Sequence, residues 1–353
     1  MGLFFSTHPA GGTVRWQPST AVVLAGLLVF LGLSSAAAQG LGAGGPNLSA
    51  FSVAPDLGAL PTEQLKRLVH ERPAALGSLS LGFPHNGQLL NPVQLRSGES
   101  FEVVAPDFCY GTQETASYLE TAVNVVKKAH PNTPPLHIGH ISKPGGGYLS
   151  PHLSHQSGRD VDLGFYYKSK RTWYRRATSD TLDVERTWTL IRAMITQTDL
   201  EFLFIDHWVQ ILLKNHAERI GEDKTWLAQV FHGTAQRPAL IRHEPGHATH
   251  IHARFFNPEA QENARLAYPY LLAEEIIEPV VIFHEHKVKS GETLGRLAKR
   301  YGISVQAIQQ ANGLRGTTIV AKRIYKIPKA GGPAPVSDTF QLPPRVLPPP
   351  SNH

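Results

Sequence analysis

Two short segments concentrate histidine and aspartate in this chain of 353 residues. Residues 152–162 read HLSHQSGRDVD, and residues 247–252 read HATHIH. Zinc in hydrolytic enzymes is bound by three His, Asp or Glu side chains and keeps a fourth position for water, whose pKa the metal lowers to about 7. Both segments therefore carry the residue types from which a hydrolytic zinc site is built.

The alternation of polar and apolar residues predicts how these side chains are presented. A strand over residues 160–163 places Asp160 and Asp162 on one face and directs their apolar neighbours to the other face. A strand over residues 250–255 does the same for its two histidines. If the two strands lie near each other, imidazoles and carboxylates meet in one cleft, within reach of a single ion.

Spacing alone leaves an alternative open. Single histidines usually occupy ordinary core or surface positions, and H-x-H pairs often arise by chance. A metal site is the favoured interpretation, and unrelated histidines are the alternative. Spacing also does not decide whether Asp160 or Asp162 would be the ligand.

Residues 139–162 and 246–252 resemble the penicillin-insensitive murein endopeptidases. The first of these segments begins GHISKPGGG, and the second reads GHATHIH. The resemblance covers about residues 76–258 and implies the zinc fold shared by lysostaphin, the D-Ala-D-Ala peptidases and hedgehog. The expected fold class is α+β, a domain with a small central antiparallel sheet and flanking helices.

The resemblance also implies a role for each residue of the two segments. It makes His155, Asp162 and His252 the ligands of one zinc ion, because the family pattern has Asp seven residues after the first ligand. Asp160 is then the candidate to accept the free N–H of a ligating imidazole. The implied catalytic residues, which would act as base or transition-state stabiliser and hold substrate or water, are His250, His247 and His152.

Some features depart from the family pattern. Members from enteric bacteria carry several disulfides, whereas this chain has one cysteine, Cys109, which we expect to be a buried apolar residue. Residues 178–183, where some members present a second metal-binding pair, contain no histidine, so one metal is expected. Asp206 and His207 are expected to have a structural or solvent role.

The overall charge favours an anionic partner. The chain has 34 Lys and Arg against 28 Asp and Glu, a formal net charge of +6. No basic cluster with interleaved aromatic residues is present, so nucleic acid is not an expected partner. A bacterial wall is an anionic surface that fits this charge.

The N-terminus resembles a secretory signal. Arg15 precedes an apolar run over residues 21–33, and small residues follow up to Ala38. This order predicts a signal peptide over residues 1–38 that is cleaved after Ala38, with an uncleaved anchor as the alternative. The run is shorter than the about 20 residues of a membrane span. A periplasmic or secreted, wall-associated protein is expected.

Composition divides the remaining chain into a tether, a large domain, a small domain and a tail. Helices are predicted near residues 114–129 and 184–195, and a buried strand at 202–205 is followed by another helix. The expected organisation is a Gly/Pro-rich linker (39–75) with one short helix over residues 62–71, then the endopeptidase domain (76–258) and a connector (259–284). A LysM domain (285–330) and a Pro-rich, disordered or polyproline-like tail (331–353) follow.

The LysM prediction depends on a dense motif set near the C-terminus. Residues 286–294 read HKVKSGETL, residues 297–304 read LAKRYGIS, and YKIP follows at 325–328. Ser304 can cap a second helix after the one that Gly302 ends, which gives the order βααβ. LysM domains bind N-acetylglucosamine-containing glycans, so the resemblance implies wall-glycan anchoring. A helical hairpin that binds protein is the alternative.

Together these features predict a zinc endopeptidase that hydrolyses the D-alanyl cross-bridges between peptidoglycan stem peptides. Its partners would be those peptides and the glycan strands. A D-Ala-D-Ala carboxypeptidase of the same fold and a non-catalytic wall-binding protein are the alternatives.

Overall fold

The computed structural model describes most of the chain beyond its N-terminal segment. The predicted signal peptide over residues 1–38 lies outside the described residues. Within the part of the chain that is described, no helix is long and apolar enough to cross a membrane. The described residues are 55–169, 173–280, 283–329 and 341–350.

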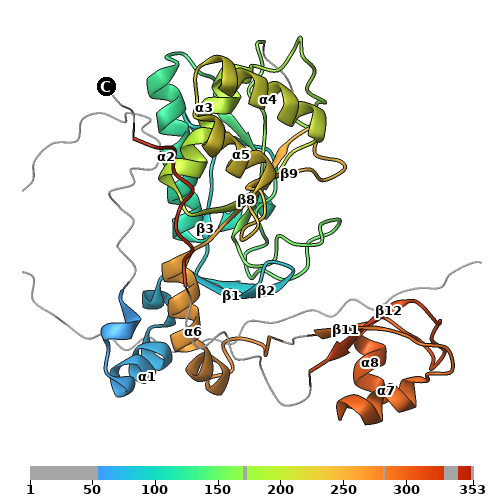
Figure 1. Ribbon diagram of the computed structural model, residues 1–353. Coiled ribbons are helices and arrows are strands. Elements are labelled where there is room, and N and C mark those ends of the chain that lie inside the picture. The colour runs from blue at the N-terminus through green and yellow to red at the C-terminus, as the bar shows by residue number, and fades with distance from the viewer. Residues whose placement is uncertain (1–54, 170–172, 281–282, 330–340, 351–353) are drawn as a thin grey trace, which may run out of the picture. The chain divides into compact units, whose positions relative to one another are not determined.

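A six-stranded mixed sheet forms the centre of residues 55–280 (Figure 1). This unit contains the predicted catalytic residues and is named the catalytic domain for that prediction. The neighbouring pairs β6–β7, β7–β10 and β10–β8 are antiparallel, and the outer pairs β4–β6 and β8–β9 are parallel. The strands, in their order across the sheet, are β4 (Phe101–Val103), β6 (Leu136–Ile138), β7 (Asp160–Leu163), β10 (Ile251–Phe255), β8 (Leu200–Phe204) and β9 (Ile241–Arg242).

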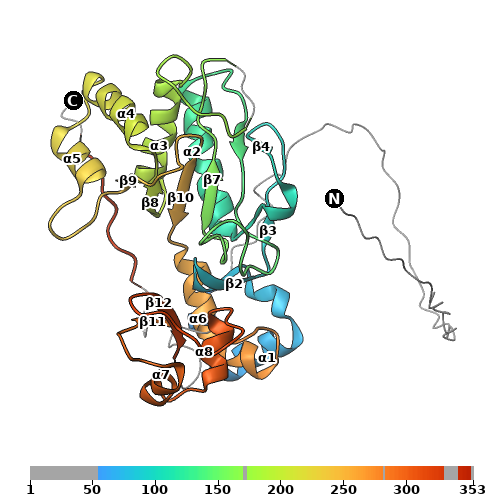
Figure 2. The same ribbon diagram turned by 90° about the vertical axis from the view of Figure 1, so that its right-hand side faces the viewer.

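Helices cover one face of this sheet (Figure 2). Val161 of β7 and Ala253 of β10 join this core with no exposed surface, while the polar residues of both strands lie on the opposite face. The predicted alternation is therefore confirmed for both strands. The helices of this layer are α2 (Gln113–Ala129), α3 (Val184–Gln197), α4 (His207–Arg219) and α5 (Lys224–His232).

A second hydrophobic cluster extends the catalytic domain beyond its expected limits. Leu57, Leu65 and Val69, which fall in the expected linker, are buried against Ala267 and Leu271, which fall in the expected connector. These segments fold because they carry apolar residues at helical spacing despite the nearby Gly and Pro. The elements are α1 (Thr62–Glu71), β1 (Leu79–Phe83), β2 (Asn86–Leu90) and α6 (Pro258–Ala273), with 3-10 turns at Leu57–Ala59 and Pro73–Leu76.

The two clusters are joined by polar contacts at the start of α6. The Glu114 carboxylate on α2 accepts hydrogen bonds from the backbone N–H groups of Glu259 (3.1 Å) and Ala260 (2.8 Å). Thr115 donates to the side chain of Asn257 at 3.1 Å. Carboxylates satisfy free N–H groups at helix N-termini. Smaller elements nearby are β3 (Val93–Gln94), β5 (Tyr110–Gly111) and a 3-10 turn at Pro106–Phe108.

The predicted LysM domain has the expected order βααβ and its own core. Thr293 and Ser304 cap the two helices by accepting from the N–H groups of Arg296 (3.3 Å) and Ala307 (3.1 Å). Gly302 ends the first helix in the left-handed conformation, with φ of 66°. The elements are β11 (Phe283–Lys287), α7 (Leu294–Tyr301), α8 (Val305–Ala311) and β12 (Ile324–Pro328).

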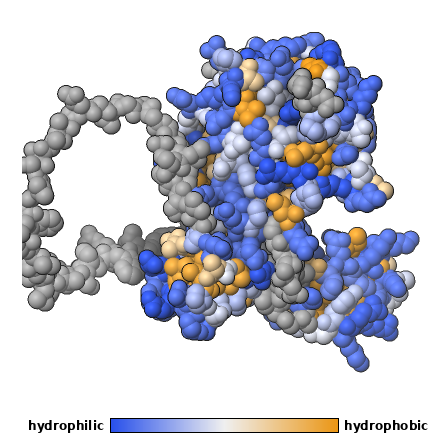
Figure 3. All heavy atoms as spheres, turned by 60° about the vertical axis from the view of Figure 1, so that its left-hand side comes forward, coloured by the Kyte–Doolittle hydropathy of each residue, from blue (hydrophilic) through white to orange (hydrophobic). Residues whose placement is uncertain are grey.

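The described part of the C-terminal tail packs on the catalytic domain. Residues 341–350 form no helix or strand, but Val346 packs against the main core of the catalytic domain. The packing is possible because the tail is not uniformly polar: Leu342 and Val346 stand among its prolines. On the face seen in Figure 3 the described surface is mostly hydrophilic, with separate small apolar patches.

Candidate metal centre and active site

The three predicted ligands converge on one point of the polar sheet face. Strand pairing places His252 directly opposite Asp162. Nε2 of His155 lies 3.2 Å from Nδ1 of His252, and each of these nitrogens lies 3.3 Å from Oδ1 of Asp162. Ligands about 2.0–2.1 Å from a tetrahedral zinc ion lie roughly 3.3–3.4 Å from one another. The donor set therefore has the size and the chemistry that such an ion requires.

Local contacts fix the orientation of His155. Its Nδ1 lies 3.0 Å from the carbonyl oxygen of Ile141, which can only accept, so Nδ1 donates and Nε2 keeps its lone pair for the cluster. The backbone of His155 is left-handed, with φ of 63°. Its N–H donates to Oδ2 of Asp160 at 3.0 Å, which stabilises this uncommon conformation.

Asp160 lies behind the three converging residues. It accepts two hydrogen bonds from Arg254, from Nε at 2.6 Å and Nη2 at 3.0 Å. Its Oδ1 lies 3.5 Å from Nε2 of His252, a buried atom with no hydrogen-bond partner among the described residues. Asp160 is therefore held by Arg254 and contacts both His155 and His252, which places it to orient the two residues.

The electrostatics of the cluster call for positive charge. Burial by itself disfavours the charged imidazole of His252, yet the neighbouring carboxylates of Asp160 and Asp162 raise its pKa to about 9. Burial likewise opposes ionisation of Asp162, but His155 and His252 hold the pKa of that carboxyl well below its usual range. Two buried carboxylates at one point are stabilised by a cation, and a divalent ion supplies that charge.

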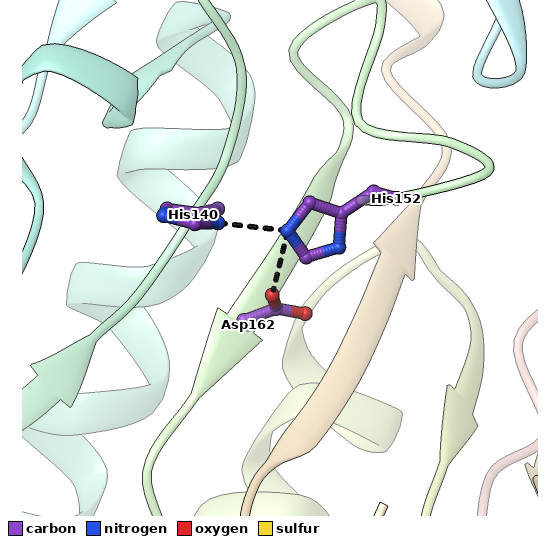
Figure 4. A group of neighbouring side chains, drawn as sticks. All are labelled: His140, His152 and Asp162. Atoms are coloured by element: carbon purple, nitrogen blue, oxygen red, sulfur yellow. Dashed lines mark hydrogen bonds and ion pairs between the residues drawn. The ribbon is translucent and has the colours of Figure 1, made fainter. Parts of the chain in front are cut away.

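A second group shares Asp162 with the first (Figure 4). Nδ1 of His140 lies 2.7 Å from Nε2 of His152, which lies 3.9 Å from Oδ2 of Asp162. Burial, reinforced by the neighbouring His155, lowers the pKa of His152 to about 4, so this imidazole is neutral at pH 7. The sequence placed His140 in a motif but assigned it no role. Because both groups use one carboxylate, they form a single centre.

The remaining predicted histidines line the same centre. Nε2 of His250 lies 3.6 Å from Oδ1 of Asp162, and its ring centroid lies 4.8 Å from that of His247. Burial lowers the pKa of His250 to about 4 and also lowers the pKa of His247. Both imidazoles are therefore neutral at pH 7 and able to accept a proton.

Two aromatic residues that the sequence did not single out border His250. The ring of Tyr174 stacks on His250 with centroids 5.2 Å apart, and Trp173 lies 6.3 Å from the same ring. Gly139 permits this approach, because a Cβ there would lie 2.4 Å from Cζ2 of Trp173. These residues lie in a loop without periodic pattern, so only their aromatic character could have marked them.

Other polar candidates have structural roles. Asp206 caps α4 by accepting from the N–H of Trp208 at 3.3 Å, in line with the structural role expected for it. Cys109 has no exposed surface, its thiol donates to the Gly139 carbonyl, and burial raises its pKa to about 12. The prediction of a buried, unreactive cysteine is confirmed.

Comparison with known proteins shows the class of protein to which this chain belongs and then its family. A LysM domain model matches residues 286–328, and a penicillin-insensitive murein endopeptidase model matches residues 80–271. The class that the two domains define is a peptidoglycan hydrolase with a wall-binding module. The second match spans more than half of the 353 residues. The chain belongs to the penicillin-insensitive murein endopeptidase family.

Individual relatives agree with the family match. The chain is 25% identical over 232 residues to a penicillin-insensitive murein endopeptidase of Yersinia enterocolitica, covering 60% of this chain and 76% of that protein. It is 26% identical over 210 residues to the Haemophilus influenzae protein of the same name, covering 52% and 63%. An Enterococcus faecalis autolysin matches over 42 residues at 50% identity, covering 12% of this chain and 6% of that protein.

Proposed function

We propose that this protein is a zinc metallopeptidase that hydrolyses the D-alanyl peptide cross-bridges of peptidoglycan. The single observation that carries the proposal is the buried triangle of His155, Asp162 and His252, with sides of 3.2 and 3.3 Å. His155 contributes Nε2, His252 contributes Nδ1 and Asp162 contributes Oδ1. A zinc ion bound by these atoms supplies Lewis acidity, which polarises a peptide carbonyl and lowers the pKa of water.

The neutral histidines around the triangle supply proton transfer. His250 lies at its edge, 3.6 Å from Asp162, and can accept a proton from the nucleophilic water and deliver it to the leaving amine. His247 and His152 border the centre on either side and can hold substrate or water by hydrogen bonds. Asp160 keeps His252 and His155 in position while Arg254 neutralises its charge.

The LysM domain supplies the second half of the proposal. It would bind the N-acetylglucosamine-containing strands to which the cleaved peptides are attached. Attachment to the same polymer raises the local concentration of the catalytic domain near its substrate without changing the catalytic centre. The site of action would be the periplasm or the outside of the cell, in association with the wall.

Purified sacculi and muropeptides test the proposal. Wild-type protein should convert cross-linked dimers to monomers in a chromatographic profile, and His252→Ala should leave the dimers intact and bind less zinc by elemental analysis. His232→Ala, which changes an exposed histidine on α5, is the matched control and should behave as wild type.

The other outcomes identify the alternatives. Shortened monomers without loss of dimers would indicate a carboxypeptidase. Wall binding without zinc and without any change in muropeptides would indicate a non-catalytic protein. Either result would contradict the proposed endopeptidase activity.

A further inference from the structure

The C-terminal segment, defined here as residues 342–346, lies on the catalytic domain although the LysM domain separates the two in sequence. Both Nε and Nη2 of Arg345 lie 2.8 Å from Oδ1 of Asp199. The indole N–H of Trp226 donates to the Val346 carbonyl at 2.9 Å. Nη1 of Arg237 donates to the Pro344 carbonyl, also at 2.9 Å. Three side chains of the catalytic domain thus bind one short stretch of tail.

The surface that receives this segment is a groove between the end of α3, the start of β8 and the loop before β9. Its walls combine apolar residues with charged ones at the rim. Val346 of the segment packs against the main hydrophobic core from this side. The groove is lined by Ile195, Asp199, Leu200, Arg237, Leu240 and Phe256.

Two polar groups in this surface are completed by the segment. Asp199 has a side chain only 10% exposed, and its other oxygen already accepts from the Tyr118 hydroxyl at 2.8 Å. With the segment in place, Trp226 is 1% exposed and the Val346 carbonyl is the acceptor for its indole N–H. Buried polar groups without partners are costly, so these groups favour an occupant with one cation and carbonyl acceptors.

The composition of the tail matches that requirement. Residues 341–350 read QLPPRVLPPP, with Arg345 as their one charged side chain. Proline fixes φ and removes the N–H. A proline-rich segment therefore offers carbonyl acceptors and loses little conformational freedom when it docks. The donors of Trp226 and Arg237 meet such carbonyls.

The LysM domain lies in the chain between two segments that both contact the catalytic domain, so docking of the tail affects both of its ends. The polypeptide is packed on the catalytic domain up to Val280, whose N–H donates to the Tyr268 hydroxyl at 2.9 Å, and β11 begins at Phe283. After β12 ends at Pro328, the chain returns to the catalytic domain at Leu342. We propose that the groove is a built intramolecular docking site for the C-terminal segment and that this docking holds the LysM domain at both of its ends.

A domain attached at one end can pivot about that connection, whereas attachment at both ends restricts its orientations. Restricting the orientations of a linked module changes the effective concentration of one site near the other. The docked tail therefore limits how the glycan-binding module is presented relative to the catalytic centre. This inference concerns the arrangement of the domains and succeeds or fails whether or not the proposed chemistry is correct.

Distances between spin labels test the proposal in the full chain. The only native cysteine, Cys109, is fully buried, so labels can be introduced through Asn215→Cys on α4 and Gln306→Cys on α8, both at exposed positions. Double electron–electron resonance should give a narrow distance distribution. Deleting Leu342–His353 should abolish the narrow distribution and leave a broad one, because the second attachment is lost.

A single substitution separates docking from a general effect of truncation. Arg345→Ala removes the ion pair with Asp199 and should broaden the distribution, whereas Arg315→Ala removes an exposed arginine of the LysM domain and should not. Thermal unfolding of each variant verifies that the catalytic domain remains folded. An equally broad distribution in the full chain, or no change on deletion in a folded protein, would overturn the proposal.

Discussion

The LysM domain is built from neighbours in sequence, whereas the centre of the catalytic domain joins distant segments. Each LysM helix is capped by the residue directly before it, and seven buried residues between Val288 and Ile327 make its core. The catalytic centre instead brings His155 and Asp162 to His252 across paired strands. The small domain therefore depends on one core, while the centre depends on a few polar contacts. Wall adhesion and hydrolysis should be separable.

The largest expected effect is that of Asp162→Ala, which should abolish hydrolysis and leave wall adhesion intact. Removing a residue that only hydrogen-bonds to a metal ligand already lowers metal affinity or activity by about 10–100-fold. Removing the carboxylate shared by both histidine groups should lower cleavage of cross-linked muropeptides by more than about 100-fold. Cosedimentation with sacculi should be unchanged, because the LysM core is separate. Asp180→Ala, at an exposed loop position, is the control, and wild-type cleavage by Asp162→Ala would contradict the proposed centre.

Leu297→Ala should have the opposite effect and weaken wall adhesion while leaving hydrolysis intact. This side chain is fully buried in the LysM core, so the substitution should cost about 2–5 kcal/mol in the free energy of unfolding. A domain of this size has little stability to spare, so cosedimentation with sacculi should fall sharply while cleavage of soluble muropeptides stays at the wild-type rate. Val320→Ala changes a 58% exposed residue and should affect neither assay. Loss of soluble activity in Leu297→Ala would show that the two domains are not independent.

Asp160→Asn tests how far the centre depends on the carboxylate that lies behind His155 and His252. The substitution preserves shape but weakens the bonds to Arg254 and the interaction with His252. We expect zinc affinity or activity to fall by about 10–100-fold. Zinc titration and muropeptide cleavage measure the two effects, and circular dichroism verifies folding. A folded variant with unchanged zinc affinity would show that the Asp160 carboxylate does not position the ligands.

The smallest predicted effect concerns acid stability of the LysM domain. Glu292 accepts from Nε2 of His286 at 2.7 Å, from the N–H of Lys289 at 2.8 Å and from Arg300 at 2.7 Å, contacts that lower its pKa from 4.5 to about 2. Because the pKa is lower in the folded state, this stabilisation is complete above pH 4.5 and is lost as the pH falls through about 2.

Thermal unfolding of the LysM domain as a function of pH measures this effect. In Glu292→Gln the decline in stability between pH 4.5 and about 2 should become shallower than in the wild type. The comparison is made within the full chain, with the catalytic transition as the internal reference. Identical acid profiles for the two proteins would show that Glu292 is not the titrating group.

The sequence predicted elements best where a pattern repeats over a short distance. Alternation over Asp160–Leu163 matches β7 to the residue, and the one short helix expected in the tether, over Thr62–Glu71, matches α1. It did not predict β4 or β6, because three residues are too few to display a period. It also placed α1 in a linker, since Gly and Pro nearby outweighed the apolar residues that pack on α6.

The centre was predictable where its residues lie on strands and unpredictable where they lie on loops. The strand pattern and the family resemblance together led to Asp162 and His252, which the register then places opposite each other. His140 and Tyr174 come from loops whose course depends on tertiary packing, and no local pattern connects them to the centre. The docking of Arg345 on Asp199 links residues 146 apart, which single-sequence reasoning cannot relate.

The buried Cys109 has a practical consequence for handling the protein. A chain with one thiol forms no internal cross-link, so folding needs neither an oxidant nor an isomerase, and reducing buffers should not weaken it. The same thiol reports on opening of the core, because it reacts with an aromatic disulfide reagent only when the catalytic domain unfolds around it. Its labelling rate therefore measures the lifetime of the folded domain without any added probe.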